Sequence, residues 1–184
     1  MRSFIAVDIK NEKVEAAVEE LKKVKADVKV VEPQNLHLTL KFLGEIPEDV
    51  IEKIYAAMQE SFKSFQPFDI SMHSIGVFPS LKYMRVVWVG FEDGRKNLIE
   101  MQRSLDANLI GLKFKPENRF DPHLTIGRVK SPRGKEELKN FVLKHKDTDF
   151  GSAVVDKVEL KKSVLTPKGP IYSAVKTCEL KISR

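Results

Sequence analysis

The chain has 184 residues, of which 42% are hydrophobic and 32% are charged, so it can bury a substantial core and does not have the composition of a disordered chain. Its net charge of +6 favours a polyanionic partner such as nucleic acid, although exposed lysine-rich helices alone would give the same charge. The single cysteine, Cys178, excludes an intramolecular disulfide and predicts a reducing compartment.

No stretch of the sequence approaches the roughly 20 apolar residues that a membrane-spanning helix needs. The apolar run at the start of the chain is broken at Asp8, which is too early for the core of a signal peptide. The sequence therefore predicts a cytoplasmic protein that does not contact a membrane.

Strand and helix patterns alternate through the first half of the chain. The opening run of β-branched and aromatic residues predicts a strand that ends at Asp8, and apolar residues recur at helical spacing after it. Pro47 suits the first turn of a second helix. The expected elements are a strand at 3–8, a helix at 11–25, a short segment at 28–31, a strand at 36–43 and a helix at 48–63.

The second half resembles a looser copy of the same plan. Its patterns predict strands near 68–78, 84–91 and 122–129, helices at 95–110 and 134–146, and a long C-terminal hairpin over 152–165 and 171–182. No linker rich in Gly, Ser and Pro separates the halves. We therefore expect an α+β fold with antiparallel sheets, in which residues 1–184 form a single domain.

Two short segments are near-copies of each other. Each has a histidine followed two residues later by a threonine, with aliphatic residues between and after them: His37-Leu-Thr39-Leu and His123-Leu-Thr125-Ile. In a strand, residues two apart share a face. Each segment therefore places an imidazole beside a hydroxyl on the solvent side, while the aliphatic residues point into the core.

Two imidazoles facing one site can divide proton transfer between them, because a pKa near 6.5 allows both protonation states at neutral pH. The Thr39 and Thr125 hydroxyls can donate hydrogen bonds to phosphate oxygens and stabilise developing charge. This equipment suits phosphodiester chemistry without a metal or another cofactor. A zinc site is the main rival, but it would need a third ligand, for which Asp121 is the candidate.

Strand alternation assigns the neighbouring residues to one face or the other. Lys41 shares the predicted face of His37 and Thr39 and is a candidate for substrate binding, although a solvated lysine is an equal alternative. Arg128 is a second candidate, but alternation puts it on the core side unless the strand twists or ends at Gly127. Phe42 has core parity, so we expect it to pack rather than to stack on a base.

The remaining histidines and cations have plainer interpretations. His73 lacks the threonine and is predicted to lie on a strand surface, and His145 is predicted to end a lysine-rich helix. Arg119 is a weaker candidate for substrate contact. The run of Lys130, Arg133 and Lys135 could guide RNA, although such runs are usually solvated faces.

The paired motifs resemble those of the two-histidine (2H) phosphoesterase superfamily. Within it, the segments RSFIAVDI, LHLTLKFLGE, GVFPS, RVVWVG and RFDPHLTIGRVK are similar to the bacterial and archaeal RNA 2′,3′-cyclic phosphodiesterases, first named 2′–5′ RNA ligases. The resemblance covers nearly the full chain. It implies a bilobal fold, with two antiparallel sheets, outer helices and the motifs facing each other across a central cleft.

The resemblance also implies hydrolysis of a terminal 2′,3′-cyclic phosphate on RNA, such as a tRNA fragment, to a 2′-phosphate. By analogy His37 would be the general acid and His123 the general base, although the sequence itself does not decide which is which. No protein partner is implied. Two alternatives are a 2′–5′ RNA ligase that joins tRNA-half-like ends and an RNA-binding protein without turnover, which would have no need of two intact motifs.

Overall fold

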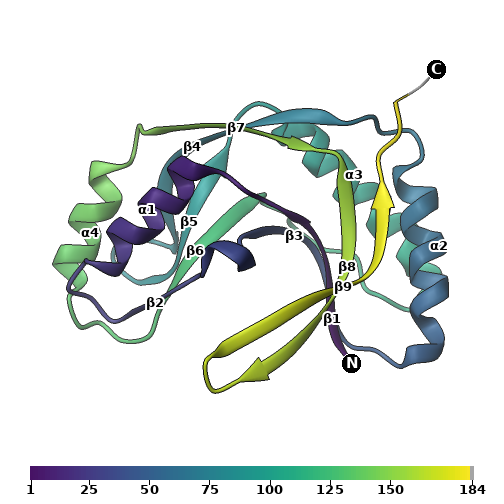
Figure 1. Cartoon of the computed structure of the whole chain (residues 1–184), viewed down its shortest axis with the longest axis horizontal. Helices are drawn as coiled ribbons and strands as arrows, with labels where there is room; N and C mark the ends of the chain where they lie inside the picture. Colours follow the sequence, from purple (N-terminus) through teal and green to yellow (C-terminus); the bar gives the residue numbers. More distant parts are fainter. Residues whose placement is uncertain (183–184) are drawn as a thin grey trace.

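The computed structural model describes residues 1–182, in which nine strands form two antiparallel sheets (Figure 1). The four-stranded sheet has the order β3-β1-β8-β9, and the five-stranded sheet has the order β2-β6-β5-β4-β7. The predicted α+β fold class with two antiparallel sheets is confirmed. The strands are β1 (Arg2–Asp8), β2 (Val28–Val30), β3 (His37–Glu45), β4 (Phe68–Pro79), β5 (Met84–Phe91), β6 (His123–Val129), β7 (Asp149–Val155), β8 (Lys157–Thr166) and β9 (Gly169–Glu179).

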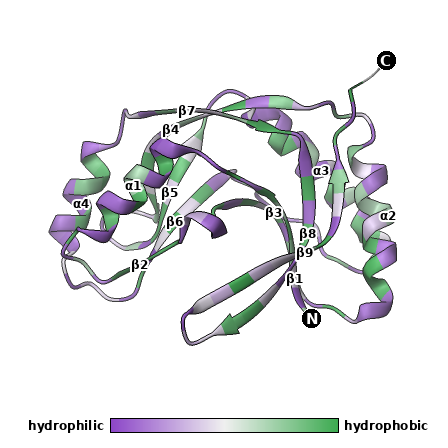
Figure 2. Cartoon of the chain, viewed as in Figure 1, coloured by the Kyte–Doolittle hydropathy of each residue, from purple (hydrophilic) through white to green (hydrophobic). Residues whose placement is uncertain are grey.

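The helices lie on the outer sides of the sheets (Figure 1). Helices α1 (Glu12–Lys22) and α4 (Lys135–Lys144) pack on the five-stranded sheet, and α2 (Ile51–Phe62) and α3 (Arg95–Leu109) pack on the four-stranded sheet. Figure 2 shows polar outer faces on these helices. In α1, for example, one stripe of apolar residues is buried while the first turn is acidic, as expected for a helix that covers a sheet. No helix within residues 1–182 is long and apolar enough to cross a membrane.

Each sheet with its two helices forms a lobe, but the lobes are not successive halves of the chain. The chain leaves β1 in the four-stranded sheet, builds α1 on the other lobe, and returns with β3. Near its end it returns once more, with β8 and β9. Nearly all the buried apolar side chains of both lobes belong to one contiguous cluster.

The C-terminal hairpin is only partly as predicted. The segment 152–165, predicted as one strand, is two strands separated at Asp156. β7 pairs with β4 and β8 pairs with β1, so the break carries the chain from one sheet to the other. Burial changes phase at this break, since Asp156 and Lys157 are both exposed between the buried Val155 and Val158. Such a change of phase does not show which sheet the next strand joins. The hairpin of β8 and β9 is present.

Candidate active site

His37 is the first residue of β3 and His123 is the first residue of β6, and these two strands are in contact. The aliphatic residues of the motifs are buried: Leu38 and Leu40 are at most 1% exposed, and Leu124 and Ile126 are fully buried. Both motif histidines and both motif threonines remain partly exposed. The structure therefore has the alternation that the sequence predicted over the four residues of each motif.

Each motif imidazole is held by the same hydrogen bond. Nδ1 of His37 lies 2.7 Å from the Asn35 carbonyl oxygen, and Nδ1 of His123 lies 2.8 Å from the Asp121 carbonyl oxygen. A carbonyl oxygen only accepts, so Nδ1 is the protonated nitrogen in both rings. A neutral imidazole then has an unprotonated Nε2 that can accept a proton, and a charged one has an Nε2 that can donate a proton.

Aromatic rings pack against both motif imidazoles. Phe4 of β1 packs against His37 at a centroid distance of 4.9 Å, and Phe78 of β4 packs edge-on against His123 at 5.1 Å. Tyr172 of β9 meets the His37 ring edge-on at 5.3 Å. Motif spacing did not identify these three residues, although Phe4 and Phe78 lie in segments that carry the family resemblance. Their rings limit the rotation of the imidazoles and so fix where Nε2 points.

A β-bulge follows the threonine in both motif strands. On β3, Ala6 pairs with Thr39 and Ile5 with Lys41, so Leu40 is the extra residue. On β6, Trp88 pairs with Thr125 and Val87 with Gly127, so Ile126 is the extra residue. A bulge of this kind reverses the side-chain alternation after it. After the bulge, Lys41 on β3 and Gly127 on β6 lie on the core side. Phe42 on β3 and Arg128 on β6 lie on the side of the motif histidine and threonine.

The bulge on β6 decides the position of Arg128. Gly127 is buried, and a Cβ added there would lie 3.0 Å from Leu21 in the core. Arg128 is exposed on the side of His123 and Thr125. Its charge affects the pKa of both His37 and Tyr172. Arg128 is therefore part of the candidate site, and the core position that strict alternation gave it is wrong.

The bulge on β3 overturns two predictions. Lys41, a candidate for lining the site with a solvated position as the equal alternative, is only 4% exposed and so has neither position. Phe42, expected to pack in the core, is 64% exposed. Phe42 occupies the place on β3 that Arg128 has on β6, with its ring 6.2 Å from that of Phe4. Its exposed ring is available for stacking on a ligand.

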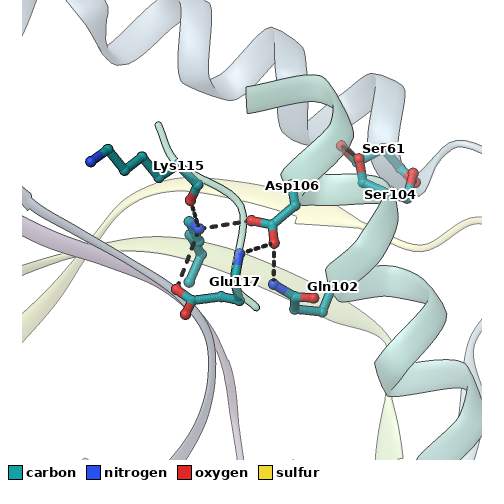
Figure 3. A network of polar contacts seen from close by, with 7 residues as sticks. Ser61, Gln102, Ser104, Asp106, Lys115 and Glu117 are labelled. Atoms are coloured by element: carbon teal, nitrogen blue, oxygen red, sulfur yellow. Dashed lines mark hydrogen bonds and ion pairs between the residues drawn. The ribbon is translucent and has the colours of Figure 1, made fainter. Parts of the chain in front are cut away.

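Lys41 instead belongs to a polar network between β3 and α3, in which Lys41, Gln102 and Asp106 are buried (Figure 3). Its Nζ lies 2.8 Å from Oδ1 of Asp106 on α3 and 3.3 Å from Oε1 of Glu117, and it donates to the Lys115 carbonyl. Oδ2 of Asp106 accepts from the Glu117 amide at 2.7 Å and from Gln102 Nε2 at 2.8 Å. The network thus ties β3 and α3 to the loop that leads into His123.

The surroundings of His37 disfavour its charged form. Burial lowers the pKa of His37 from its ordinary value of 6.5, and the positive charges of Lys161 and Arg128 act in the same direction. The hydrogen bond to the Asn35 carbonyl and the negative charge of Asp8, which pairs with Lys161, oppose this lowering. These surroundings therefore favour the neutral form of the His37 imidazole.

Asp121, the candidate third zinc ligand, forms an ion pair with Arg95 instead, while its backbone carbonyl accepts from His123. Within residues 1–182 no group of three His, Cys, Asp or Glu side chains is arranged to hold a metal ion. Arg119 is exposed and lines a separate hollow beside α3.

The other two histidines are placed as predicted. His73 lies partly exposed on β4 with Nδ1 3.4 Å from Glu92, and it shares a cross-strand row with Gly90 and His123. His145, at the end of α4, is nearly buried, and its Nε2 lies 2.9 Å from Glu20 of α1. His145 therefore has a structural role in joining two helices.

Comparisons with known proteins agree with this geometry. The family described as LigT like Phosphoesterase matches residues 7–88 and 89–172, so each matched segment carries one motif. Two proteins named RNA 2′,3′-cyclic phosphodiesterase are similar over almost their whole length. One, from Methanothermobacter thermautotrophicus, is 40% identical over 98% of this chain and 99% of its own; the other, from Methanocaldococcus jannaschii, is 44% identical over 96% of this chain and 99% of its own.

Two solved structures share the fold. A crystal structure from Thermus thermophilus superimposes with a TM-score of 0.79 at 28% identity, covering 98% of each chain. The E. coli LigT structure complexed with 3′-AMP superimposes with a TM-score of 0.72 at 26% identity, also covering 98% of each chain. The likeness therefore includes both lobes and not one motif alone.

Proposed function

Because the chain belongs to the LigT-like 2H phosphoesterase family, we propose that it is an RNA 2′,3′-cyclic phosphodiesterase whose acid–base pair is His37 and His123. The observation that carries this proposal is the repeated geometry of the two imidazoles. Each Nδ1 is fixed by the carbonyl two residues upstream, and each Nε2 is left to transfer a proton. A protein that only bound RNA would not need two such groups.

The proposed reaction is an attack of water on the phosphorus of the cyclic diester. His123 accepts a proton from the water as the new P–O bond forms, and His37 donates a proton to the 3′ oxygen as its bond to phosphorus breaks. The product is a 2′-phosphate beside a free 3′ hydroxyl. Thr39 and Thr125 donate hydrogen bonds to the non-bridging oxygens, and Arg128 adds positive charge farther along the same face of β6.

Excess EDTA is expected to leave the hydrolysis rate unchanged, because the proposed acid, base and charge stabilisation all come from side chains. The assay uses RNA that ends in a 2′,3′-cyclic phosphate, and the terminal phosphate of the product is identified after digestion. Loss of turnover in chelator, with recovery on addition of Zn²⁺ or Mg²⁺, would contradict the metal-free reaction.

The pKa of His37 predicts a difference between the pH profiles of kcat and kcat/KM. The kcat/KM profile reports the free enzyme and the kcat profile reports the bound complex. Burial is the main cause that lowers the pKa of His37, and the positive charges of Lys161 and Arg128 add to it. An anionic phosphate near the ring offsets these charges, so we expect substrate binding to raise this pKa. The limb of the profile that His37 controls should therefore lie at a lower pH in kcat/KM than in kcat.

This profile measures the effect of binding on the pKa of His37 but does not assign the two roles, because a bell-shaped profile has the same form whichever group is the acid. The substrate should be a cyclic mononucleotide, since its diester does not titrate near neutrality. The limb that binding moves is the one that His37 controls, and that limb should be missing from the profile of His37→Ala. If neither limb moves, the Arg128 charge does not act on His37 in the free enzyme as proposed.

Ligation of a 2′,3′-cyclic phosphate end to a 5′ hydroxyl would use the same two protons, with the hydroxyl in place of water. We propose hydrolysis as the main reaction because water needs no second binding site. Ends of tRNA fragments remain candidate substrates. A ligated product in the same assay, at a rate comparable to hydrolysis, would show the second activity.

A further inference from the structure

A strongly basic groove opens beside the end of β6. Its volume is about 570 Å³, and none of the side chains that line it is acidic. In the whole chain Lys and Arg outnumber Asp and Glu only by 32 to 26, so the groove is a local concentration of positive charge. The six cations of this basic groove are Lys82, Arg85, Arg128, Lys130, Arg133 and Lys135.

The charges of the basic groove are largely uncompensated. Within residues 1–182, only Arg133 among the six has a carboxylate within 4.0 Å, and Asp27 lies 3.9 Å from it. Lys82 and Lys130 are both exposed. Like charges held together without counter-charges repel one another, so binding an anion there would relieve that repulsion. A face that served only for solubility would mix both signs of charge.

Arg128 belongs to both the basic groove and the candidate active site. This residue lines the groove and also lies on the side of β6 that carries His123 and Thr125. At a rise of about 3.3 Å per residue, the strand places Arg128 roughly 17 Å from His123. A chain that entered the groove could therefore reach the histidines without leaving the protein surface.

An exposed aromatic residue completes the groove. Tyr83 is 57% exposed, and the Arg85 guanidinium lies 4.9 Å from the centre of its ring and donates to its hydroxyl at 2.7 Å. Aromatic rings and arginine planes in a basic groove are the two components of surfaces that bind single-stranded nucleic acid, because bases stack on the first and phosphates pair with the second.

We propose that the basic groove binds the backbone of single-stranded RNA on the 5′ side of the terminal cyclic phosphate, with a base stacked on Tyr83. The proposal rests on the proposed function, since the cyclic phosphate fixes which end of the RNA lies at the histidines. A cyclic mononucleotide would fill only the motif site. A longer RNA would also occupy the groove.

The test compares two neutralised double variants. Lys82→Gln/Lys130→Gln removes two charges of the basic groove, and Lys53→Gln/Lys96→Gln removes two exposed charges from α2 and α3 on the other lobe. Hydrolysis of a cyclic mononucleotide and of a pentanucleotide with the same end is measured against salt concentration. Binding of the pentanucleotide ending in a 3′-phosphate is measured by fluorescence anisotropy.

The groove variant should leave hydrolysis of the mononucleotide unchanged and should weaken both binding and hydrolysis of the pentanucleotide. Its slope of log affinity against log salt should be shallower by about 1.4, since each lost contact with single-stranded RNA removes about 0.7. Tyr83→Leu should weaken pentanucleotide binding about tenfold through lost stacking. The control variant should match wild type on both substrates.

Equal behaviour of the groove and control variants on the pentanucleotide would overturn the proposal, and so would an equal loss on both substrates. Competition by polyglutamate as effective as that by RNA of the same charge would show a surface for acidic protein segments instead. If wild type hydrolyses neither substrate, the proposed function fails, and the anisotropy measurement still decides whether the groove binds RNA.

Discussion

His37→Ala and His123→Ala are each expected to lower kcat by about 10²–10⁴-fold, the usual contribution of one general acid or base. Both side chains are partly exposed at the ends of their strands, so their removal opens no core cavity and the fold should persist. Binding of RNA should also persist, because Arg128 and the basic groove remain. Binding can be followed from the single tryptophan, Trp88, which pairs with Thr125 across the sheet.

The control for this prediction is His73→Ala. His73 lies in the same cross-strand row as His123 but outside the motifs, so the comparison separates a catalytic role from mere proximity, and we expect near wild-type activity. The double variant His37→Ala/His123→Ala should be far less impaired than the product of the single losses, because both protons move in one displacement. An inactive His73→Ala together with an active His123→Ala would refute the two-motif mechanism.

Smaller effects are expected at the threonines. Thr39→Ala and Thr125→Ala each remove one neutral hydrogen bond to a phosphate oxygen and leave both imidazoles in place. Their losses in kcat should therefore be smaller than those of the histidine variants, and their pH profiles should keep the limbs of wild type.

The sequence predicted the four residues of each motif correctly because local alternation determines them. A buried aliphatic next to each of His37 and His123 leaves the imidazoles only one face. The same rule failed at Lys41 and Phe42 because an extra residue, Leu40, sits between the paired positions. A bulge depends on the register of the partner strand, which a single strand's sequence does not contain.

The sequence pattern also did not predict which distant residues contact the motif histidines. Phe4, Phe78 and Tyr172 come from three strands that only the tertiary fold brings to the imidazoles. At Asp156 the phase of burial changes, but the sequence does not show that β8 then pairs with a strand of the other sheet. Tyr172 contacts His37 because β8 and β9, near the end of the chain, join the four-stranded sheet that also contains β3. The spacing of apolar residues along one strand does not predict this long-range connection.

The second large effect is the loss of stability expected when Lys41 is replaced. Its ammonium and the Asp106 carboxylate are both almost fully buried, and both have further polar partners. Removing one member of such a pair leaves the other charge desolvated without its partner, which usually costs about 3–5 kcal/mol of stability. For a protein of this size that corresponds to a fall in Tm of roughly 6–20 °C.

Lys41→Met should therefore be strongly destabilised in urea titration and thermal melting, whereas Lys63→Met should stay within about 1 kcal/mol of wild type. Lys63 is the matched control because its ion pair with Glu60 lies on the surface of the protein. The double variant Lys41→Met/Asp106→Asn should be more stable than Lys41→Met, since it removes the stranded charge while an amide oxygen can still accept from the Glu117 backbone. The same loss in Lys41→Met and Lys63→Met, or no recovery in the double variant, would show that the buried pair does not fix β3, α3 and the loop before His123 to one another.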